Sequence, residues 1–391
     1  MDALVNVALH EGWRVTVVTD RSVIGRTEVA AGWTGRASVR SAEDDWRATP
    51  VGRATVAAGV ARLAVRGRRL PSPDERRRAG GSRAIPFIQA YWSGPGRELL
   101  ASADLVHAVG KPKPFVTTAI AAGSRAGVAI AYSEVAQVTA AYAHRPDLAG
   151  FADVANRIDL LLAFYDEQVT DIRSQFGYRG PAVRVEQWAD RLEDDLLALP
   201  ESPDPSVETE ERPVVVGALG RLSPEKGLLT LVEGFAAATS AEPRLRLRIA
   251  GTGPAGPALA ERITQLGVAD RVDLLGFVAD RVAFYGGIDV FVVASDEEGG
   301  PITGVEAMAA GRAVVSTSAG AMRERIRPEI DGLRFEPGDA ATLADHLVAL
   351  ARAPARRAAL AAAARLRYRE RCQASVTIPL LTRAWDSLAP G

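Results

Sequence analysis

Two glutamates with seven residues between them stand where an apolar strand is expected to turn into a helix. The strand over Ile288–Ala294 is followed by Glu298, a Gly-Gly-Pro bend at 299–301, and an alanine-rich helix that carries Glu306. Backbone N–H groups converge at such a helix N-terminus, glycine allows close approach, and proline suits the first helical position. The stretch can therefore bind an anion. Two carboxylates beside a phosphate site suit a ligand that carries both phosphates and hydroxyls, and a nucleotide sugar is such a ligand.

A second turn from strand to helix supplies positive charge. The apolar strand over Pro213–Leu219 runs into the sequence GRLSPEKG, and an amphipathic helix is expected over Leu228–Ala238. The Ser-Pro pair at 223–224 can cap and begin that helix. Arg221 and Lys226 would then be fixed beside its N-terminus, where positive charge suits a diphosphate.

These two motifs resemble those of a known enzyme family. The frame S-x-x-E-G…E-A-M-A-A-G around Glu298 and Glu306 resembles the paired-glutamate signature of retaining glycosyltransferases with the GT-B fold, in particular the group called family four or glycosyl transferases group 1. The GRLSPEKG run is similar to that family's phosphate-binding stretch. The resemblance implies that Glu298 holds hydroxyls of the donor sugar and that Glu306 bonds the nucleotide ribose. It also implies that Arg221 and Lys226 neutralise the leaving diphosphate, so the expected catalytic residues are Arg221, Lys226 and Glu298.

Two weaker signals follow in the order that the family shows. A strand over Leu245–Ala250 ends in Gly251-Thr252-Gly253, a turn that in the family approaches the nucleotide through its backbone. The stretch over 272–278 resembles the family's segment whose backbone contacts the base, although a plain buried strand explains it equally well. The expected donor-binding residues are Gly220, Gly253, Phe277, Val278, Gly299, Gly300, Pro301, Ile302 and Glu306.

Strand-like and helix-like segments alternate along the chain, which indicates parallel sheets covered by helices. The sequence predicts strands at 14–19, 105–109, 128–132, 160–164 and 182–185, and then at 214–218, 245–250, 272–275, 290–294, 313–317 and 333–335. The fold class is therefore α/β, and the resemblance implies GT-B, two Rossmann-like domains that face a central cleft. We expect an acceptor-side domain over 1–200, an acidic, proline-rich linker over 201–213, a donor-binding domain over 214–372, and a C-terminal helix over 373–391 that crosses back to the first domain.

The first domain is expected to lack its first strand. Met1–Gly12 is typical of the end of a helix that, in the family, follows a first strand and a glycine-rich loop. That strand would lie in the middle of the sheet, so its neighbours would lose their hydrogen-bonding partners. We therefore expect either that the natural gene starts upstream of Met1 or that the chain is poorly stable in its first domain and weakly active.

The acceptor side carries fewer signals. His107 lies in a predicted strand, Lys111 in the Gly-Lys-Pro-Lys-Pro turn after it, and Ser133 and Glu134 at the end of the next strand, where open α/β sheets bind ligands. A buried histidine and a solvated lysine are the simpler interpretation. Many relatives place a histidine near the acceptor where Tyr132-Ser133-Glu134 stands here, so no acceptor-side base is identified. In a retaining reaction the departing phosphate can itself take the acceptor proton.

Composition limits the class of protein. With 391 residues the chain has room for two domains, and its net charge of −1 gives no reason to expect nucleic acid as a partner. The single cysteine, Cys372, excludes an intramolecular disulfide and suits the reducing cytoplasm. No apolar run reaches the roughly 20 residues of a membrane span. Four scattered histidines and one cysteine show no ligand spacing, so neither a metal nor a cofactor is expected.

An arginine-rich segment is the one feature that suggests a membrane. Residues 62–83 contain eight arginines among glycines and prolines. Such a segment is more often a solvated loop than a contact with an anionic lipid or a membrane surface. Peripheral membrane association is therefore the less favoured of the two interpretations.

Together these patterns predict a retaining glycosyltransferase that moves a hexose from a UDP- or GDP-sugar to a hydroxyl acceptor (a sugar, a lipid-linked sugar or a natural product). The alternatives are a catalytically impaired nucleotide-sugar-binding protein and a sugar-nucleotide epimerase, which would need acid and base groups around the sugar. A phosphorylase would need a lysine for its pyridoxal cofactor, and the chain has three lysines in all. A dehydrogenase would need G-x-G-x-x-G followed by an acid about 20 residues later, and no such pattern is present.

Overall fold

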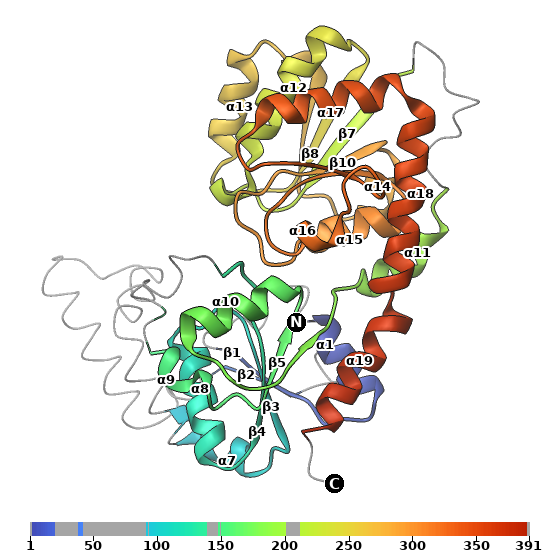
Figure 1. Cartoon of the computed structure of the whole chain (residues 1–391). Coiled ribbons are helices and arrows are strands. Elements are labelled where there is room, and N and C mark those ends of the chain that lie inside the picture. The colour runs from blue at the N-terminus through green and yellow to red at the C-terminus, as the bar shows by residue number, and fades with distance from the viewer. Residues whose placement is uncertain are drawn as a thin grey trace, which may run out of the picture.

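The computed structural model of the chain describes residues 2–19, 38–41, 91–92, 94–138, 148, 150–200 and 212–388. The arginine-rich segment over 62–83 and nearly all of the linker expected over 201–213 lie outside the described residues. The described chain forms two α/β units, one above the other in Figure 1, and its last helices run along one side of both.

The second unit is built on a six-stranded parallel sheet in the order β12-β11-β10-β7-β8-β9. The strands are β7 (Val214–Leu219), β8 (Leu245–Ala250), β9 (Val272–Gly276), β10 (Val290–Val293), β11 (Ala313–Thr317) and β12 (Leu333–Phe335). Most are apolar runs, as expected for a parallel sheet that is covered on both faces. One face packs against α12 (Leu228–Ala241), α13 (Gly256–Gln265) and α17 (Ala340–Arg352). The other packs against α11 (Glu193–Ala198), α14 (Arg281–Gly286), α15 (Ile302–Ala309) and α18 (Pro354–Arg371).

The first unit contains a four-stranded parallel sheet in the order β3-β4-β5-β6. These strands are β3 (Leu105–Val109), β4 (Ala129–Ser133), β5 (Leu160–Ala163) and β6 (Ala182–Arg184). On one face lie α8 (Pro114–Arg125), α9 (Ala152–Ala155) and α10 (Asp166–Phe176), and α7 (Pro95–Ala101) packs on α8. The other face is covered by α1 (Asp2–His10) and α19 (Ala374–Asp386).

Two further strands of the first unit form a separate sheet. Strand β1 (Thr16–Thr19) pairs in parallel with β2 (Ser38–Ser41), and within the described part of the chain neither strand pairs with β3. In the described chain, β1 and β2 thus form a sheet apart from β3-β4-β5-β6.

Every strand that the sequence predicts is present, with ends that differ by two residues or fewer. Strand β2 was not predicted, because Ser-Val-Arg-Ser is too short and too polar to show an apolar pattern. Within the described chain, no helix combines the length and the apolar character that crossing a membrane requires.

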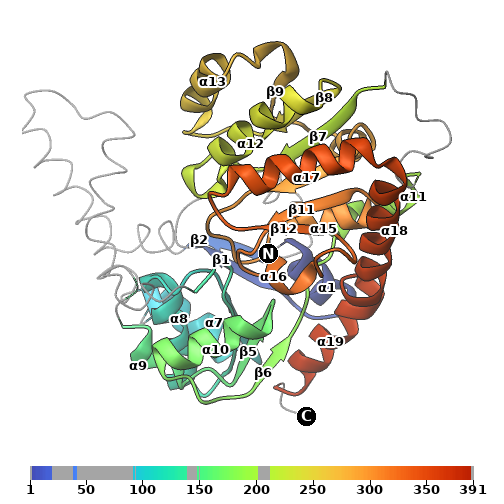
Figure 2. The same ribbon diagram turned by 45° about the horizontal axis from the view of Figure 1, so that its top comes forward.

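The C-terminal helices are interrupted at a proline. Helix α17 ends at Arg352, and α18 begins at Pro354. Proline cannot donate the backbone hydrogen bond that a continuous helix needs and tolerates the first helical position, so the chain turns there. After Cys372 the chain bends again into α19, which packs on the first sheet beside α1 (Figure 2).

The segment before the linker also differs from the expected domain boundary. Residues 189–199 were assigned to the first domain, but Ala189 and Leu196 are buried in the core of the second unit beside Phe284 and Tyr285. Helix α11 packs on α14 and α15 because Leu196 gives it an apolar face. The chain therefore crosses from the first unit to the second just after Trp188, which is still buried in the core of the first unit.

Candidate active site

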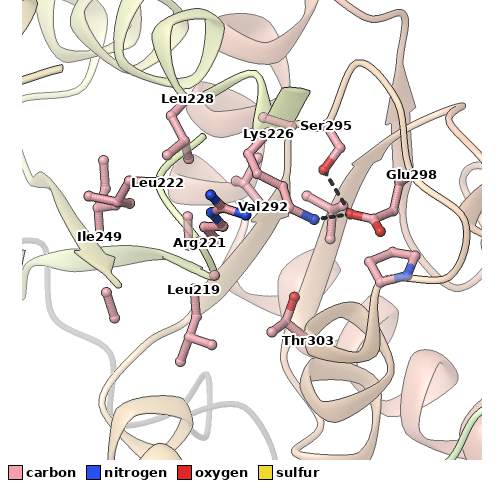
Figure 3. Close-up of a pocket in the computed structure, with 16 residues that line it drawn as sticks. Leu219, Arg221, Leu222, Lys226, Leu228, Ile249, Val292, Ser295, Glu298 and Thr303 are labelled. Carbon is pink, nitrogen blue, oxygen red and sulfur yellow. Dashed lines mark hydrogen bonds and ion pairs between the residues drawn. The ribbon is translucent and has the colours of Figure 1, made fainter. Parts of the chain in front are cut away.

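The C-terminal ends of β7, β8 and β10 enclose a cavity in the second unit, the position where parallel sheets usually bind ligands. Its polar lining comes from the turn after β7, which supplies Arg221 and Lys226, and from the loop after β10, which supplies Ser295 and Glu298 (Figure 3). Thr303, in the first turn of α15, lines the same cavity. The structure therefore brings together all three residues that were predicted to be catalytic.

Lys226 and Glu298 form an ion pair in this cavity. The Lys226 Nζ donates to Glu298 Oε2, and the Ser295 hydroxyl lies 3.4 Å from the same oxygen. The two side chains are 28% and 14% exposed, so the pair is accessible to a ligand. An ammonium group and a carboxylate are thus held against each other in this cavity.

Gly227 brings these charges together. The residue has a left-handed backbone (φ 60°), and a Cβ at this position would collide with the carbonyl oxygen of Ala294 at the end of β10. Only glycine therefore lets the turn after β7 lie directly against β10.

The turn itself differs from the expected helix cap. Residues Pro224–Lys226 form a short 3-10 turn, and α12 begins only after Gly227. The Ser223 hydroxyl does not cap a helix but donates to Glu225 Oε1 at 2.6 Å. This hydrogen bond is the main cause that lowers the pKa of Glu225, so the carboxylate stays ionised beside Lys226.

The Gly299-Gly300 pair contacts the first unit. Side-chain atoms at Gly299 would collide with the backbone of Val135, and at Gly300 with the side chains of Gln187 and Phe164. The two glycines were expected to allow the close approach of an anion, but in the structure they lie against the first unit, where the Val135 backbone leaves no room for a side chain at position 299. Pro301 precedes α15 instead of occupying its first helical position. Ile302 begins the helix, and its side chain packs against the core on the α14 and α15 face of the second unit's sheet.

Glu306 lies inside the second unit and does not reach the cavity around Lys226. The residue is 1% exposed, and its carboxylate accepts from Arg281 Nη1 at 2.6 Å and from the Tyr285 hydroxyl at 2.9 Å. Burial raises the pKa of Glu306, and Arg281 opposes this rise. Arg281 is 37% exposed and therefore stands between Glu306 and solvent.

The remaining donor-side residues surround the turns after β7, β8 and β9. Gly253 is packed so tightly that a Cβ would collide with the Leu222 backbone, and Gly220 lines the cavity. Phe277, just after β9, is 72% exposed, whereas Val278 packs against the core on the α14 and α15 face of the sheet. A large apolar ring that is exposed to solvent at the C-terminal end of a strand suits contact with a flat ligand group.

A second cavity lies between the two units and opens onto the same ion pair. It contains about 900 Å³ of empty, partly solvent-open space. The first unit contributes Lys111 and Gln137, and the second contributes Lys226, Glu297 and Glu298. Gln137 Oε1 also accepts a hydrogen bond from the Glu298 backbone N–H at 3.2 Å.

Of the four residues expected on the acceptor side, Lys111 alone lines this second cavity. His107 Nε2 is 2.9 Å from the Ser133 hydroxyl, and its ring lies 5.9 Å from that of Trp385 in α19. The Glu134 carboxylate is buried and accepts from the Tyr132 hydroxyl at 2.7 Å and from the Ala136 N–H at 2.8 Å. These contacts give His107, Ser133 and Glu134 structural partners.

The burial of His107 predicts how the stability of the fold depends on pH. Burial, with a smaller contribution from the chain's amino terminus, lowers its pKa from 6.5 to about 4. The unfolded chain binds a proton between those values that the folded chain does not, so the free energy of unfolding should fall as the pH drops from 6.5 to 4. Each pH unit contributes up to about 1.4 kcal/mol. Unfolding by urea at several pH values should show this loss.

The control for this prediction is His107→Gln, which keeps a polar group near Ser133 but has no proton to gain. This variant should lose less stability over the same pH range than the wild-type chain. Equal losses would show that His107 is not held neutral by its surroundings.

Gln137, Arg281 and Tyr285 are among the residues of this region that were not identified from the sequence. Arg281 and Tyr285 are four residues apart in α14 and so face Glu306 together, a spacing that a helix prediction there could have revealed. No pattern in the sequence marks Gln137, because its partner Glu298 is 161 residues away.

Comparison with known proteins agrees with this geometry. Residues 213–353 match the family described as glycosyl transferases group 1. Mannosylfructose-phosphate synthase of Agrobacterium fabrum is 36% identical over 135 residues, which are 32% of this chain and 30% of that protein. D-inositol 3-phosphate glycosyltransferase of Rhodococcus opacus is 34% identical over 162 residues, 39% of this chain and 36% of that protein. The chain spans about a third of the length of the first curated relatives that it matches.

Solved structures resemble the whole chain. The crystal structure of Anabaena HepE in complex with UDP has a TM-score of 0.71 at 18% identity, and the match covers 99% of this chain and 96% of HepE. At this identity the likeness shows the fold, which is GT-B: two Rossmann-like units with parallel sheets.

Proposed function

Because residues 213–353 match the group 1 glycosyltransferases, we propose that the chain transfers a hexose from a UDP- or GDP-sugar to a hydroxyl acceptor with retention of the anomeric configuration. The acceptor is a sugar, a lipid-linked sugar or a natural product. The UDP found in the structure of HepE favours UDP over GDP as the nucleotide of the donor.

The observation that carries this proposal is the ion pair between Lys226 and Glu298, with Arg221 lining the same cavity. Each partner matches a different part of a nucleotide sugar. The ammonium suits the diphosphate, and the carboxylate accepts hydrogen bonds from sugar hydroxyls. Donor binding would separate the pair and give each group a ligand partner.

The chemistry then follows from the positions of the charges. As the glycosidic bond breaks, negative charge grows on the diphosphate, and Arg221 and Lys226 stabilise it. Glu298 orients the sugar, and the cavity between the units gives the acceptor hydroxyl access to it. The departing phosphate oxygen takes the proton of that hydroxyl, since His107 and Glu134 are occupied by structural contacts. Glu306, held by Arg281 and Tyr285, is the proposed contact to the ribose.

A panel of UDP- and GDP-sugars tests the proposal in two steps. In thermal-shift measurements the true donor should stabilise the fold, by roughly 2.7 kcal/mol at a concentration one hundred times its Kd. The same donor should then release free UDP or GDP in a coupled assay, slowly with water and faster with a suitable acceptor. Binding without any release would instead identify a catalytically impaired nucleotide-sugar-binding protein, and no binding by any nucleotide would refute the proposal.

A further inference from the structure

Three consecutive residues of the short helix α16 (Met322–Arg325) join the second unit to the first. Arg323 Nη1 donates to both carboxylate oxygens of Glu167 in α10, at 2.7 and 2.8 Å. Arg325 Nε donates to Glu186 after β6 at 2.9 Å. We call Arg323, Glu324 and Arg325 the α16 clasp.

Glu324 makes the most contacts in the clasp. Its carboxylate accepts from the backbone N–H groups of Asp166 and Glu167 at the N-terminus of α10, at 3.2 and 3.1 Å, and from Arg184 Nη1. A carboxylate at the first N–H groups of a helix satisfies donors that have no partner within the helix. Glu324 is therefore matched to the first unit by geometry as well as by charge.

The three residues of the clasp contribute unequally to the stability of the contact between the units. Arg323 and Glu167 are 46% and 43% exposed, and exposed ion pairs contribute little. Arg325 and Glu186 are 1% and 5% exposed, so loss of Glu186 would leave the buried charge of Arg325 without its ion-pair partner. The arginines Arg325 and Arg184 overcome the effect of burial and keep the pKa of Glu186 below its usual value. The clasp thus depends mainly on Glu324 and Arg325.

The turn that leads into α16 holds the loop that carries Glu298. The Ala321 N–H donates to the Gly299 carbonyl at 2.9 Å. Gly320 has a left-handed backbone (φ 52°), and a Cβ there would collide with the Glu298 carbonyl. From the other side, Gln137 of the first unit accepts from the Glu298 N–H. The loop is therefore fixed between α16 and the first unit.

We propose that Gln137 and the α16 clasp are positioning residues for Glu298, so that the first unit completes the part of the donor site that holds the sugar. This inference rests on the proposed function. The diphosphate part of the site, with Arg221 and Lys226, is formed by the second unit alone. The sugar part requires both units in the arrangement that the clasp holds.

Two variants and one matched control test the inference. Gln137→Ala removes the acceptor for the Glu298 N–H, and Glu324→Gln removes the charge that binds α10 and Arg184. The control is Glu233→Gln, which weakens an ion pair with Arg262 between α12 and α13, inside the second unit. For each protein, calorimetry gives Kd for UDP and for the UDP-sugar that binds the wild-type chain best, and small-angle X-ray scattering gives the radius of gyration.

Both test variants should bind UDP within about twofold of wild type, whereas their affinity for the UDP-sugar should fall about three- to tenfold, the loss expected for one hydrogen bond. Glu324→Gln should also increase the radius of gyration, and Glu233→Gln should change none of these values. Unchanged UDP-sugar affinity in both variants, or equal losses for UDP and UDP-sugar, would overturn the inference. A wild-type chain that binds neither ligand would refute the proposed function instead, and the radius of Glu324→Gln against the control would still show whether the clasp joins the units.

Discussion

Replacing Lys226 with alanine should lower the rate of sugar transfer by roughly 100- to 1000-fold, the effect of removing one fixed charge from a site where charge develops. The loss should appear in kcat, because the negative charge on the diphosphate grows as the bond to the sugar breaks. Arg221→Ala, which changes the other cation of the cavity, should have an effect of the same kind. Steady-state kinetics with a saturating donor measure both.

The matched control is Lys113→Ala. Lys113 is also a lysine close to a helix N-terminus, but it is exposed before α8 in the first unit. This variant should retain nearly wild-type turnover. The melting temperature of Lys226→Ala should stay close to that of wild type, since the side chain is 28% exposed. Wild-type turnover in Lys226→Ala would show that the cation does not act on the leaving group.

Replacing Glu298 with alanine should separate the affinities for a nucleotide sugar and for the bare diphosphate. Each charge-assisted hydrogen bond to a sugar hydroxyl contributes about 1.5–3 kcal/mol, so donor affinity should fall by at least tenfold. Affinity for UDP should stay the same or rise, because Lys226 loses the partner that competes with phosphate. Calorimetric titration of the variant with UDP and with the UDP-sugar gives both values.

For this variant the control is Glu233→Ala, which removes a carboxylate from an ion pair that does not line the cavity and should leave both affinities unchanged. Equal losses for UDP and the UDP-sugar in Glu298→Ala would mean that Glu298 does not contact the sugar.

The second unit could be predicted from the sequence because its signals are local. Strand, turn and helix follow one another within a few residues, so the sequence already places Arg221, Lys226 and Glu298 just after parallel strands. The structure shows that these strands, β7 and β10, are neighbours. Gly227 belongs to the same motif, and its left-handed backbone explains why glycine ends the GRLSPEKG stretch.

The contacts between the two units could not be predicted in this way. Gly299 and Gly300 are explained by the first unit, and the α16 clasp pairs residues that are about 140 to 160 positions apart in the chain. Single-sequence patterns report the period of one element and carry no record of such distant partners. The same holds for His107, whose partner Trp385 comes from the last helix.

The central claim, transfer of a sugar with retention from a nucleotide donor, is tested most directly by proton NMR of the first product. The wild-type chain is mixed with the α-linked nucleotide sugar that stabilises it best, and the anomeric protons are followed during the first turnovers. The account predicts that free UDP or GDP appears together with a sugar that is initially α, whether the acceptor is water or an added hydroxyl compound. A sugar that appears first as the β anomer, or a bound donor that stays intact with every acceptor offered, would contradict it.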